Sequence, residues 1–187
     1  MRLSPRSKFL LLVGVFAGPV LAAYLAYFGW RPAGHTNYGD LLEVTPLQHT
    51  AGTAVDGSPL DLAGLRGKWL MVHLGPADCD PACAQRLYLM RQTRIAQGRE
   101  QSRIERLWVL TDAGTVAPAL LREHPGLHVW RPSVAGFAAQ FPAMDAASGH
   151  IYLVDPLGNL MLRFPAPPDA KRMMKDLKLL LKASQIG

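Results

Sequence analysis

WLMVHLGPADCDPAC, residues 69–83, contains both cysteines of this 187-residue chain, Cys79 and Cys83. Residues 69–74 form a short apolar run of the kind shown by strands that are buried on both faces, and Gly75-Pro76 interrupts it. From Cys79 onward the apolar residues recur at a helical period, which predicts a helix that runs to about residue 97. A buried strand therefore leads to the first thiol, and the second thiol lies one turn inside a helix.

The spacing of Cys79 and Cys83 has chemical consequences. Helical residues four positions apart share a face and lie about 5 to 6 Å from one another, a separation that a disulfide tolerates. The pair can therefore form a disulfide or hold a metal jointly. Asp78 or Asp80 is the predicted N-cap of the helix. Unpaired N–H groups at the helix N-terminus favour a thiolate, although the two neighbouring carboxylates oppose it, and we expect Cys79 to be the nucleophile.

An uncharged apolar segment precedes this region. Residues 9–30 are long enough to cross a hydrocarbon core of about 30 Å, and basic residues precede them. The positive-inside rule predicts that residues 1–8 stay in the cytoplasm and that the rest of the chain is exported, anchored in the plasma (inner) membrane with its body on the periplasmic side. A signal peptide cleaved near residues 20–22 is the alternative, but the apolar run continues past that site, which favours an uncleaved anchor.

The composition excludes several classes of protein. The net charge of +6 does not indicate nucleic-acid binding, because no basic run is interleaved with aromatic residues. Two cysteines are too few for a disulfide scaffold or for a closed structural zinc site. A purely stabilising disulfide is disfavoured because so short a loop removes little chain entropy. In an oxidising compartment the pair indicates a redox or metal-binding role.

The remaining pattern predicts a linker over residues 31–50 and one domain over residues 51–187. The linker is rich in Gly, Pro and polar residues. The order of elements predicts an α/β fold with a mixed central sheet flanked by helices. A hairpin is predicted at 53–62, before the first buried strand. The elements predicted after the cysteine helix are a strand at 104–111, a helix at 115–124 capped by Thr115, a strand at 127–130, a small helix at 133–141, a hairpin at 151–164 and a helix at 169–184 capped by Asp169. The last helix is amphipathic; it covers a sheet, which we favour, or lies on an anionic membrane surface.

This order of elements and the position of the cysteines resemble the thioredoxin-like superfamily and, more narrowly, the Sco family of cytochrome c oxidase assembly proteins. That family is membrane-anchored, faces the periplasm or intermembrane space, and has a strand ending in Phe-Gly-Tyr-Thr before Cys-Pro-x-x-Cys-Pro. Here Leu74-Gly-Pro-Ala77 precedes Cys79-Asp-Pro-Ala-Cys83, and Asp155-Pro-Leu-Gly158 follows Ile151-Tyr-Leu153 as in the family's penultimate hairpin. The resemblance covers the chain from about Ala51 to its end.

Some features depart from the family. Neither cysteine is followed by proline, and the family's copper-ligand histidine falls where this chain has residues 144–146, Met-Asp-Ala. His150 is the nearest replacement, although a histidine at the start of a strand is commonly not a ligand. Met144 and Met161 carry soft sulfur that would suit Cu(I), or they fill the core. His73 and His128 are predicted to be core residues, and His35 and His49 are predicted to be loop residues.

The resemblance implies assistance to oxidase assembly by thiol–disulfide exchange, in which Cys79 attacks a partner and Cys83 resolves the mixed disulfide. Binding of Cu(I) by the two thiolates, with His150 as a candidate further ligand, stays open as a second role. The expected partners are the membrane and a respiratory oxidase subunit or another exported protein. A general exported thiol oxidoreductase and a non-catalytic assembly scaffold are the alternatives.

Overall fold

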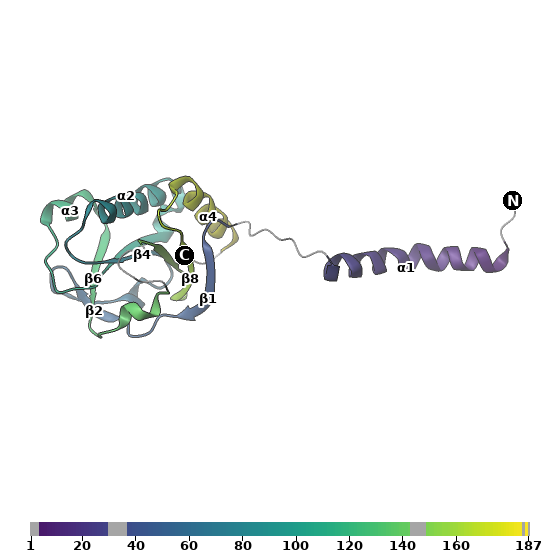
Figure 1. Cartoon of the computed structure of the whole chain (residues 1–187), viewed down its shortest axis with the longest axis horizontal. Coiled ribbons are helices and arrows are strands. Elements are labelled where there is room, and N and C mark those ends of the chain that lie inside the picture. The colour runs from purple at the N-terminus through teal and green to yellow at the C-terminus, as the bar shows by residue number, and fades with distance from the viewer. Residues whose placement is uncertain (1–3, 30–36, 143–148, 185, 187) are drawn as a thin grey trace. The chain divides into compact units, whose positions relative to one another are not determined.

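The computed structural model describes residues 4–29, 37–142, 149–184 and 186 (Figure 1). The chain divides into two compact units, Met1–Thr36 and Asn37–Gly187. The described part of the first unit is the helix α1 (Pro5–Gly29), which is long and apolar enough to cross a membrane. The apolar helix predicted over residues 9–30 is therefore confirmed, except that residue 30 lies outside the described residues.

The described residues of the second unit form one mixed sheet of eight strands, in the order β1-β8-β7-β4-β5-β6-β2-β3. The three strands β4, β5 and β6 are parallel, and every other neighbouring pair is antiparallel. The strands are β1 (Asp40–Pro46), β2 (Ala51–Ala54), β3 (Pro59–Asp61), β4 (Trp69–Gly75), β5 (Ile104–Leu110), β6 (Leu127–Pro132), β7 (Ile151–Val154) and β8 (Asn159–Phe164). This confirms the predicted α/β fold with a mixed central sheet.

The helices of this unit gather on one side of the sheet, as Figure 1 shows for α2, α3 and α4. They are α2 (Pro81–Ile95), α3 (Pro118–Glu123) and α4 (Ala170–Ala183). We call the side that they cover the helical face; its buried residues include Met71, Cys83, Leu87, Trp108 and Leu177. Side chains alternate along a strand, so each strand sends its remaining side chains to the opposite side.

We call that opposite side the aromatic face, because the rings of Trp130, Phe137, Phe141 and Tyr152 pack against one another there. Short 3-10 turns, η1 (Leu62–Leu65) and η3 (Phe137–Gln140), cover it instead of long helices. A further 3-10 turn, η2 (Gly98–Arg103), joins α2 to β5. The sheet is therefore buried on both faces, which explains the continuous apolar run in β4.

The domain begins earlier than the predicted boundary at residue 51. Asp40–Pro46, within the predicted linker, is the strand β1, and the compact unit starts at Asn37. β1 is an edge strand that pairs with β8 alone among the described strands, and nearly all of its side chains are exposed. It therefore lacks the apolar alternation by which a strand is identified from sequence.

Two predicted helices are shorter than expected. α3 begins at Pro118 with Ala117 as its N-cap, not Thr115, because a proline fits the first helical position and holds the residue before it in an extended conformation. The predicted helix at residues 133–141 is reduced to η3, since Gly136 adopts a positive φ of 88° immediately before it.

Candidate functional site

The loop that carries Cys79 is fixed to the neighbouring strand. β4 and β5 are parallel, so their carboxyl ends meet at the same edge of the sheet. Asp112, two residues beyond β5, accepts hydrogen bonds from the backbone N–H of Ala77 at 2.9 Å and of Gly114 at 3.2 Å. A side chain at Gly114 would collide with the Ala77 Cβ atom, 2.9 Å from the position of a Cβ there. Asp112 thus holds the loop between β4 and α2 in place.

The N-terminus of α2 sets the positions of the two cysteines. Asp80 is the N-cap, and its carboxylate accepts the backbone N–H of Cys83 at 2.6 Å. Pro81 occupies the first helical position, where a missing N–H costs no hydrogen bond. The structure therefore selects Asp80 over Asp78 as the cap. Cys79 lies just before the helix, and Cys83 lies in its first turn.

Cys79 and Cys83 form a disulfide, with Cα atoms 5.3 Å apart. The two sulfur-bearing side chains differ in accessibility. Cys83 is 3% exposed and packs into the core of the helical face, whereas Cys79 is half-buried at its edge. A molecule that approaches from solvent therefore meets the Cys79 side chain first.

The segment that leads into β7 lies against α2 close to the cysteines. Arg86 follows Cys83 by three residues, and a Cβ at Gly149 would lie 2.8 Å from the Arg86 Nη1 atom. Gly149 also has a positive φ of 54°, so both space and backbone conformation favour glycine there. Burial lowers the pKa of Arg86, and the carboxylate of Asp80 opposes this shift.

A histidine is buried beneath the first turns of α2. His73 is 1% exposed, and strand alternation places it on the helical face with Met71. Its Nε2 atom would lie 3.2 Å from a Cβ at Gly75, so the ring points toward the end of β4 that leads to Cys79. Burial, reinforced by the positive charge of Arg86, lowers the pKa of His73 to about 3 against weaker opposing effects of the His150 backbone and Asp80. The imidazole is therefore neutral at physiological pH.

The structure does not bring His150 to the cysteine pair. Its Nδ1 atom lies 2.8 Å from the carbonyl oxygen of Phe164, and its ring packs against Tyr152 with centroids 6.1 Å apart. Tyr152 belongs to the aromatic face, so the His150 side chain is directed away from the face that holds Cys83.

The other predicted donors also lie away from the cysteine pair or outside the described residues. Met161 lines a hollow with Trp69, at the start of β4, whereas Cys79 follows the end of that strand. Met144 and His35 lie outside the described residues. His49 is exposed, and His128 is half-buried rather than core, with its Nε2 atom 3.4 Å from the Glu105 carboxylate.

The described residues offer few donors for copper. Within residues 4–29, 37–142, 149–184 and 186, no group of three His, Cys, Asp or Glu side chains could hold a metal ion. The donors present are the two sulfur atoms, which become thiolates only when the disulfide is reduced. A pair of thiolates suits Cu(I), and the two sulfur atoms are donors that the structure brings together.

Asp112 and Arg86 were not identified from the sequence, whereas His73 was predicted to be a core residue and is 1% exposed. Asp112 carries a signal that was available, because it follows a buried strand parallel to β4 and such loops meet at one edge of the sheet. Arg86 carries none, because its place depends on the segment before β7 that packs against α2 at Gly149.

The fold is that of solved Sco proteins. Yeast Sco1 with copper bound shares 17% identity with a TM-score of 0.61, over 81% of this chain and 96% of that one. Bradyrhizobium japonicum ScoI with copper bound shares 19% identity with a TM-score of 0.54, over 76% of this chain and 99% of that one. BsSco, described with a disulfide switch, shares 14% identity with a TM-score of 0.58, over 78% of this chain and 98% of that one. The resemblance to Sco proteins is thereby confirmed for the fold.

At the level of sequence, a search of curated proteins gives no match to the chain. A family model described as a transmembrane-like, thioredoxin-like, C-terminal domain matches residues 69–184, which run from the start of β4 to the end of α4. The match spans the cysteine loop, α2, the parallel strands and the final hairpin. The chain therefore belongs to the family of transmembrane-like, thioredoxin-like C-terminal domains.

Proposed function

We propose that this chain is an exported, membrane-anchored thiol–disulfide oxidoreductase that acts in the assembly of cytochrome c oxidase. The observation that carries the proposal is the disulfide between Cys79, half-buried at the surface, and Cys83, 3% exposed at the start of α2. Thiol–disulfide exchange requires one sulfur that a partner can reach and one that is protected, because attack is then directed to a single sulfur atom.

The proposed reaction moves two electrons between the pair and a partner. In the reduced protein the Cys79 thiolate attacks one sulfur of a partner disulfide, and the other partner sulfur leaves as a thiolate. Cys83, after losing its proton, attacks the Cys79 sulfur and displaces the second partner thiolate. The partner is then a dithiol and this chain carries the Cys79–Cys83 disulfide, which an exported dithiol reductant must reduce before the next cycle.

Two lines of support connect this chemistry to oxidase assembly. BsSco, which shares the fold, is described as having a disulfide switch and as a member of the Sco family of cytochrome c oxidase assembly proteins. The helix α1, with Arg6 and Lys8 near its N-terminal end, supports an anchor whose start is cytoplasmic, so that Asn37–Gly187 is on the exported side. There the expected targets are disulfides of exported proteins, such as a cysteine pair of an oxidase subunit.

Copper handling is the second candidate function. The closeness of the two sulfur atoms favours it, as does the copper bound in the yeast and Bradyrhizobium structures that share the fold. We rank it below thiol exchange because His150 points to the aromatic face and the described residues contain no three-ligand group. If copper is carried, it is cargo held by Cys79 and Cys83 alone among these residues.

The test is the double variant Cys79→Ser/Cys83→Ser in cells that depend on the chain for oxidase assembly. We expect assembled oxidase to be lost while the level of the variant chain stays unchanged. Ala82→Ser, which adds a serine to the same turn and keeps both sulfur atoms, is the matched control and should support assembly. Full assembly with the double variant would refute both the redox and the copper function and leave a scaffold role.

A titration of the reduced chain with Cu(I) against a competing chelator separates the two functions. A thiol exchanger releases the metal to the chelator, whereas a copper carrier retains about one Cu(I) per chain. Retention would move copper handling ahead of thiol exchange.

A further inference from the structure

Three arginine side chains of the helical face lie close together away from the cysteine pair. Arg91 and Arg94 are three residues apart on α2, so they lie on the same side of that helix. Arg106 belongs to β5, and strand alternation places it with Trp108 on the face that α2 covers. None of the three arginines forms an ion pair with a carboxylate in the part of the chain that the structure describes. We call them the arginine cluster.

Backbone carbonyl groups hold the arginine cluster together. Each guanidinium donates one hydrogen bond to a carbonyl oxygen, either between the end of α3 and β6 or at the start of β5. The bonds run from Arg91 Nη1 to Glu123, from Arg106 Nη2 to Pro125 at 2.5 Å, and from Arg94 Nε to Ile104 at 2.6 Å. A carbonyl oxygen accepts a hydrogen bond but carries no full negative charge. These bonds therefore fix the guanidinium groups without neutralising them.

Arg106 is the most deeply buried member of the cluster. It is 2% exposed, and its Nε and Nη1 atoms are buried without a hydrogen-bond partner among the described residues. The Arg91 Nε atom and the His124 Nδ1 atom are buried and unpartnered in the same way. Arginine is rarely buried without a paired charge, because nothing else offsets the cost of removing the cation from water. The charge of Arg106 has no such pair among the described side chains.

The charges around Arg106 reinforce one another. Burial and the positive charges of Arg94 and Arg91 lower the pKa of Arg106 to about 10, and the opposing effect of Glu105 is smaller than any of these. The Glu105 carboxylate lies 3.4 Å from the His128 Nε2 atom instead. Arg106 is charged at physiological pH, so repulsion within the cluster exceeds the attraction from the nearest carboxylate.

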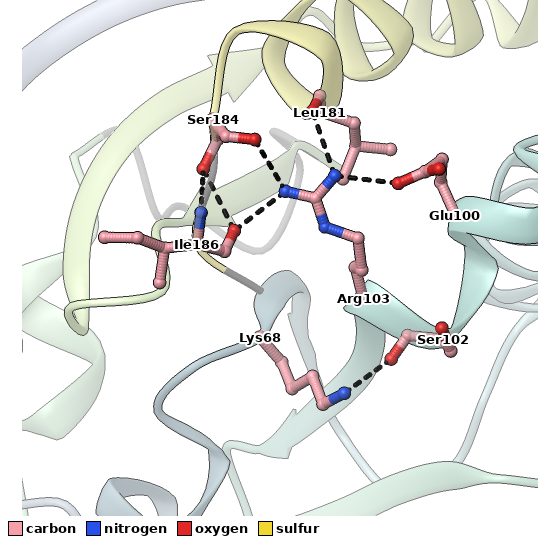
Figure 2. A network of polar contacts seen from close by, with 7 residues as sticks. All are labelled: Lys68, Glu100, Ser102, Arg103, Leu181, Ser184 and Ile186. Carbon is pink, nitrogen blue, oxygen red and sulfur yellow. Dashed lines mark hydrogen bonds and ion pairs between the residues drawn. The ribbon is translucent and has the colours of Figure 1, made fainter.

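Arg103 shows how the same chain compensates another arginine. Its guanidinium donates to the Glu100 carboxylate at 2.7 Å and to three carbonyl oxygens within residues 181–186, each at 2.9 Å (Figure 2). The Arg103 Nε atom also lacks a partner among the described residues, so the carboxylate is what distinguishes the two sites. Arg106 is the more deeply buried of the two and has only carbonyl oxygen as an acceptor.

The two helical members make the cluster accessible. Arg91 and Arg94 are half-buried, whereas Arg106 lies beneath them in the sheet. The Nη1 and Nη2 atoms of Arg94 form no hydrogen bond with the described residues. An anion that contacts Arg94 and Arg91 from solvent therefore also experiences the buried charge of Arg106.

Three positive charges in one place favour an anion that carries more than one negative charge. Guanidinium groups form parallel N–H bonds with carboxylate and with phosphate. A carboxylate offers one charge and two oxygen atoms in a plane, whereas a phosphate group offers about two charges and oxygen atoms in several directions. The second arrangement suits guanidinium groups that come from both α2 and β5.

We propose that the arginine cluster binds a phosphate-type oxyanion, with Arg91 and Arg94 in contact with it and Arg106 as the buried charge beneath. The site goes beyond the proposed function and is independent of the chemistry of Cys79 and Cys83. Binding of the anion would offset the repulsion among the three arginines.

The test is calorimetric titration of the full chain, in neutral detergent, with inorganic phosphate against a chloride background of constant ionic strength. We expect one phosphate to bind per chain. Arg94→Gln and Arg106→Met, which each remove one charge of the cluster, should weaken binding about tenfold or more. Arg99→Gln removes an equal charge at an exposed position outside the cluster and should bind as the wild type does.

A second titration distinguishes the two sources of a phosphate group. Glycerol 3-phosphate is compared with inorganic phosphate on the same chain. Weaker binding of the ester identifies a free inorganic anion as the ligand, and equal or tighter binding identifies a phosphoryl group of a larger molecule. Both results support an oxyanion site at the cluster.

The absence of saturable binding by the wild type would overturn the proposal. So would an equal affinity in the wild type, Arg94→Gln and Arg99→Gln, because binding would then not depend on the cluster. Arg94→Gln changes a half-buried side chain and keeps the test decisive if Arg106→Met does not fold. Cys79→Ser/Cys83→Ser should bind phosphate as the wild type does, so the failure of the redox proposal and the failure of this one are measured separately.

Discussion

The two faces of the sheet treat buried polar groups differently. On the helical face His73, Arg106 and Trp108 are each at most 2% exposed, and each has at least one nitrogen without a hydrogen-bond partner among the described residues. On the aromatic face, the Trp130 Nε1–H donates to the Leu60 carbonyl oxygen, and the Tyr152 hydroxyl donates to that of Pro142.

The two faces therefore differ in what they contribute to the protein. Burying a polar group carries a cost in free energy, and hydrogen bonds offset that cost for Trp130 and Tyr152 on the aromatic face. The helical face is the one into which Cys83 packs and toward which the loop of Cys79 leads. Departures from ideal packing commonly gather near functional sites, and here they lie on the face that α2 covers.

The largest expected effect is on the aromatic face. Phe137 is 2% exposed and lies between Trp130 and Phe141, with ring centroids 4.7 and 5.7 Å away. Phe137→Ala should lower the free energy of unfolding by about 3 to 5 kcal/mol, because it leaves a cavity. Urea denaturation measures this loss, and the rate at which Cys79 exchanges in the folded protein should not change.

Leu157→Ala is the control for that measurement, since Leu157 is 61% exposed. It should change the free energy of unfolding by less than about 0.5 kcal/mol. A comparable loss in both variants would contradict the view that the aromatic face supplies stability.

The next effect concerns the buried histidine of the helical face. Burial lowers the pKa of His73 from 6.5 to about 3, so between these values the unfolded chain binds a proton that the folded protein does not. Stability is therefore full above pH 6.5 and falls with decreasing pH by at most about 1.4 kcal/mol per unit. Between pH 6.5 and 4.5 the wild type should lose about 2 kcal/mol more than His73→Leu, measured by denaturation at each pH.

His49→Asn, at an exposed position with a positive φ of 55°, should follow the wild type across the same pH range. A His73→Leu variant that is as acid-sensitive as the wild type would show that His73 is not buried in its neutral form.

The smallest effect lies at the N-terminus of α2. Asp80→Ala removes the acceptor for the Cys83 backbone N–H and should lower the free energy of unfolding by about 1 kcal/mol. Asp80→Asn keeps the cap and should stay within a few tenths of wild type by thermal denaturation. Equal losses in the two variants would assign the effect to the charge rather than to the cap.

Several elements of the fold could be predicted from the sequence. The apolar run in β4, the hairpin of β7 and β8 and the cap at Asp169 were predicted because each depends on neighbouring residues in the chain. Cys79 and Cys83 lie close together as predicted, but Cys79 precedes the N-cap Asp80, so the spacing within a helix is not the reason.

The rest depends on contacts between distant parts of the chain. β1 has few buried side chains, so only its pairing with β8 marks it as a strand. His150 was a candidate ligand because of its place in the sequence, and the pairing of β7 with β8 turned its ring toward Phe164 and Tyr152. His73, by contrast, was predicted to be a core residue from its place in the buried strand, and the prediction is confirmed, since it is 1% exposed.

The measurement that tests the central claim most directly is trapping of the mixed disulfide with single cysteine variants of the full chain. In Cys83→Ser the accessible Cys79 has no resolving thiol, so a covalent adduct with an exported partner should accumulate and disappear on reduction, as seen by non-reducing electrophoresis and mass spectrometry. In Cys79→Ser the remaining thiol is buried, and we expect no adduct. Equal adducts in both variants, or an adduct with Cys79→Ser alone, would contradict the assignment of Cys79 as the reacting sulfur.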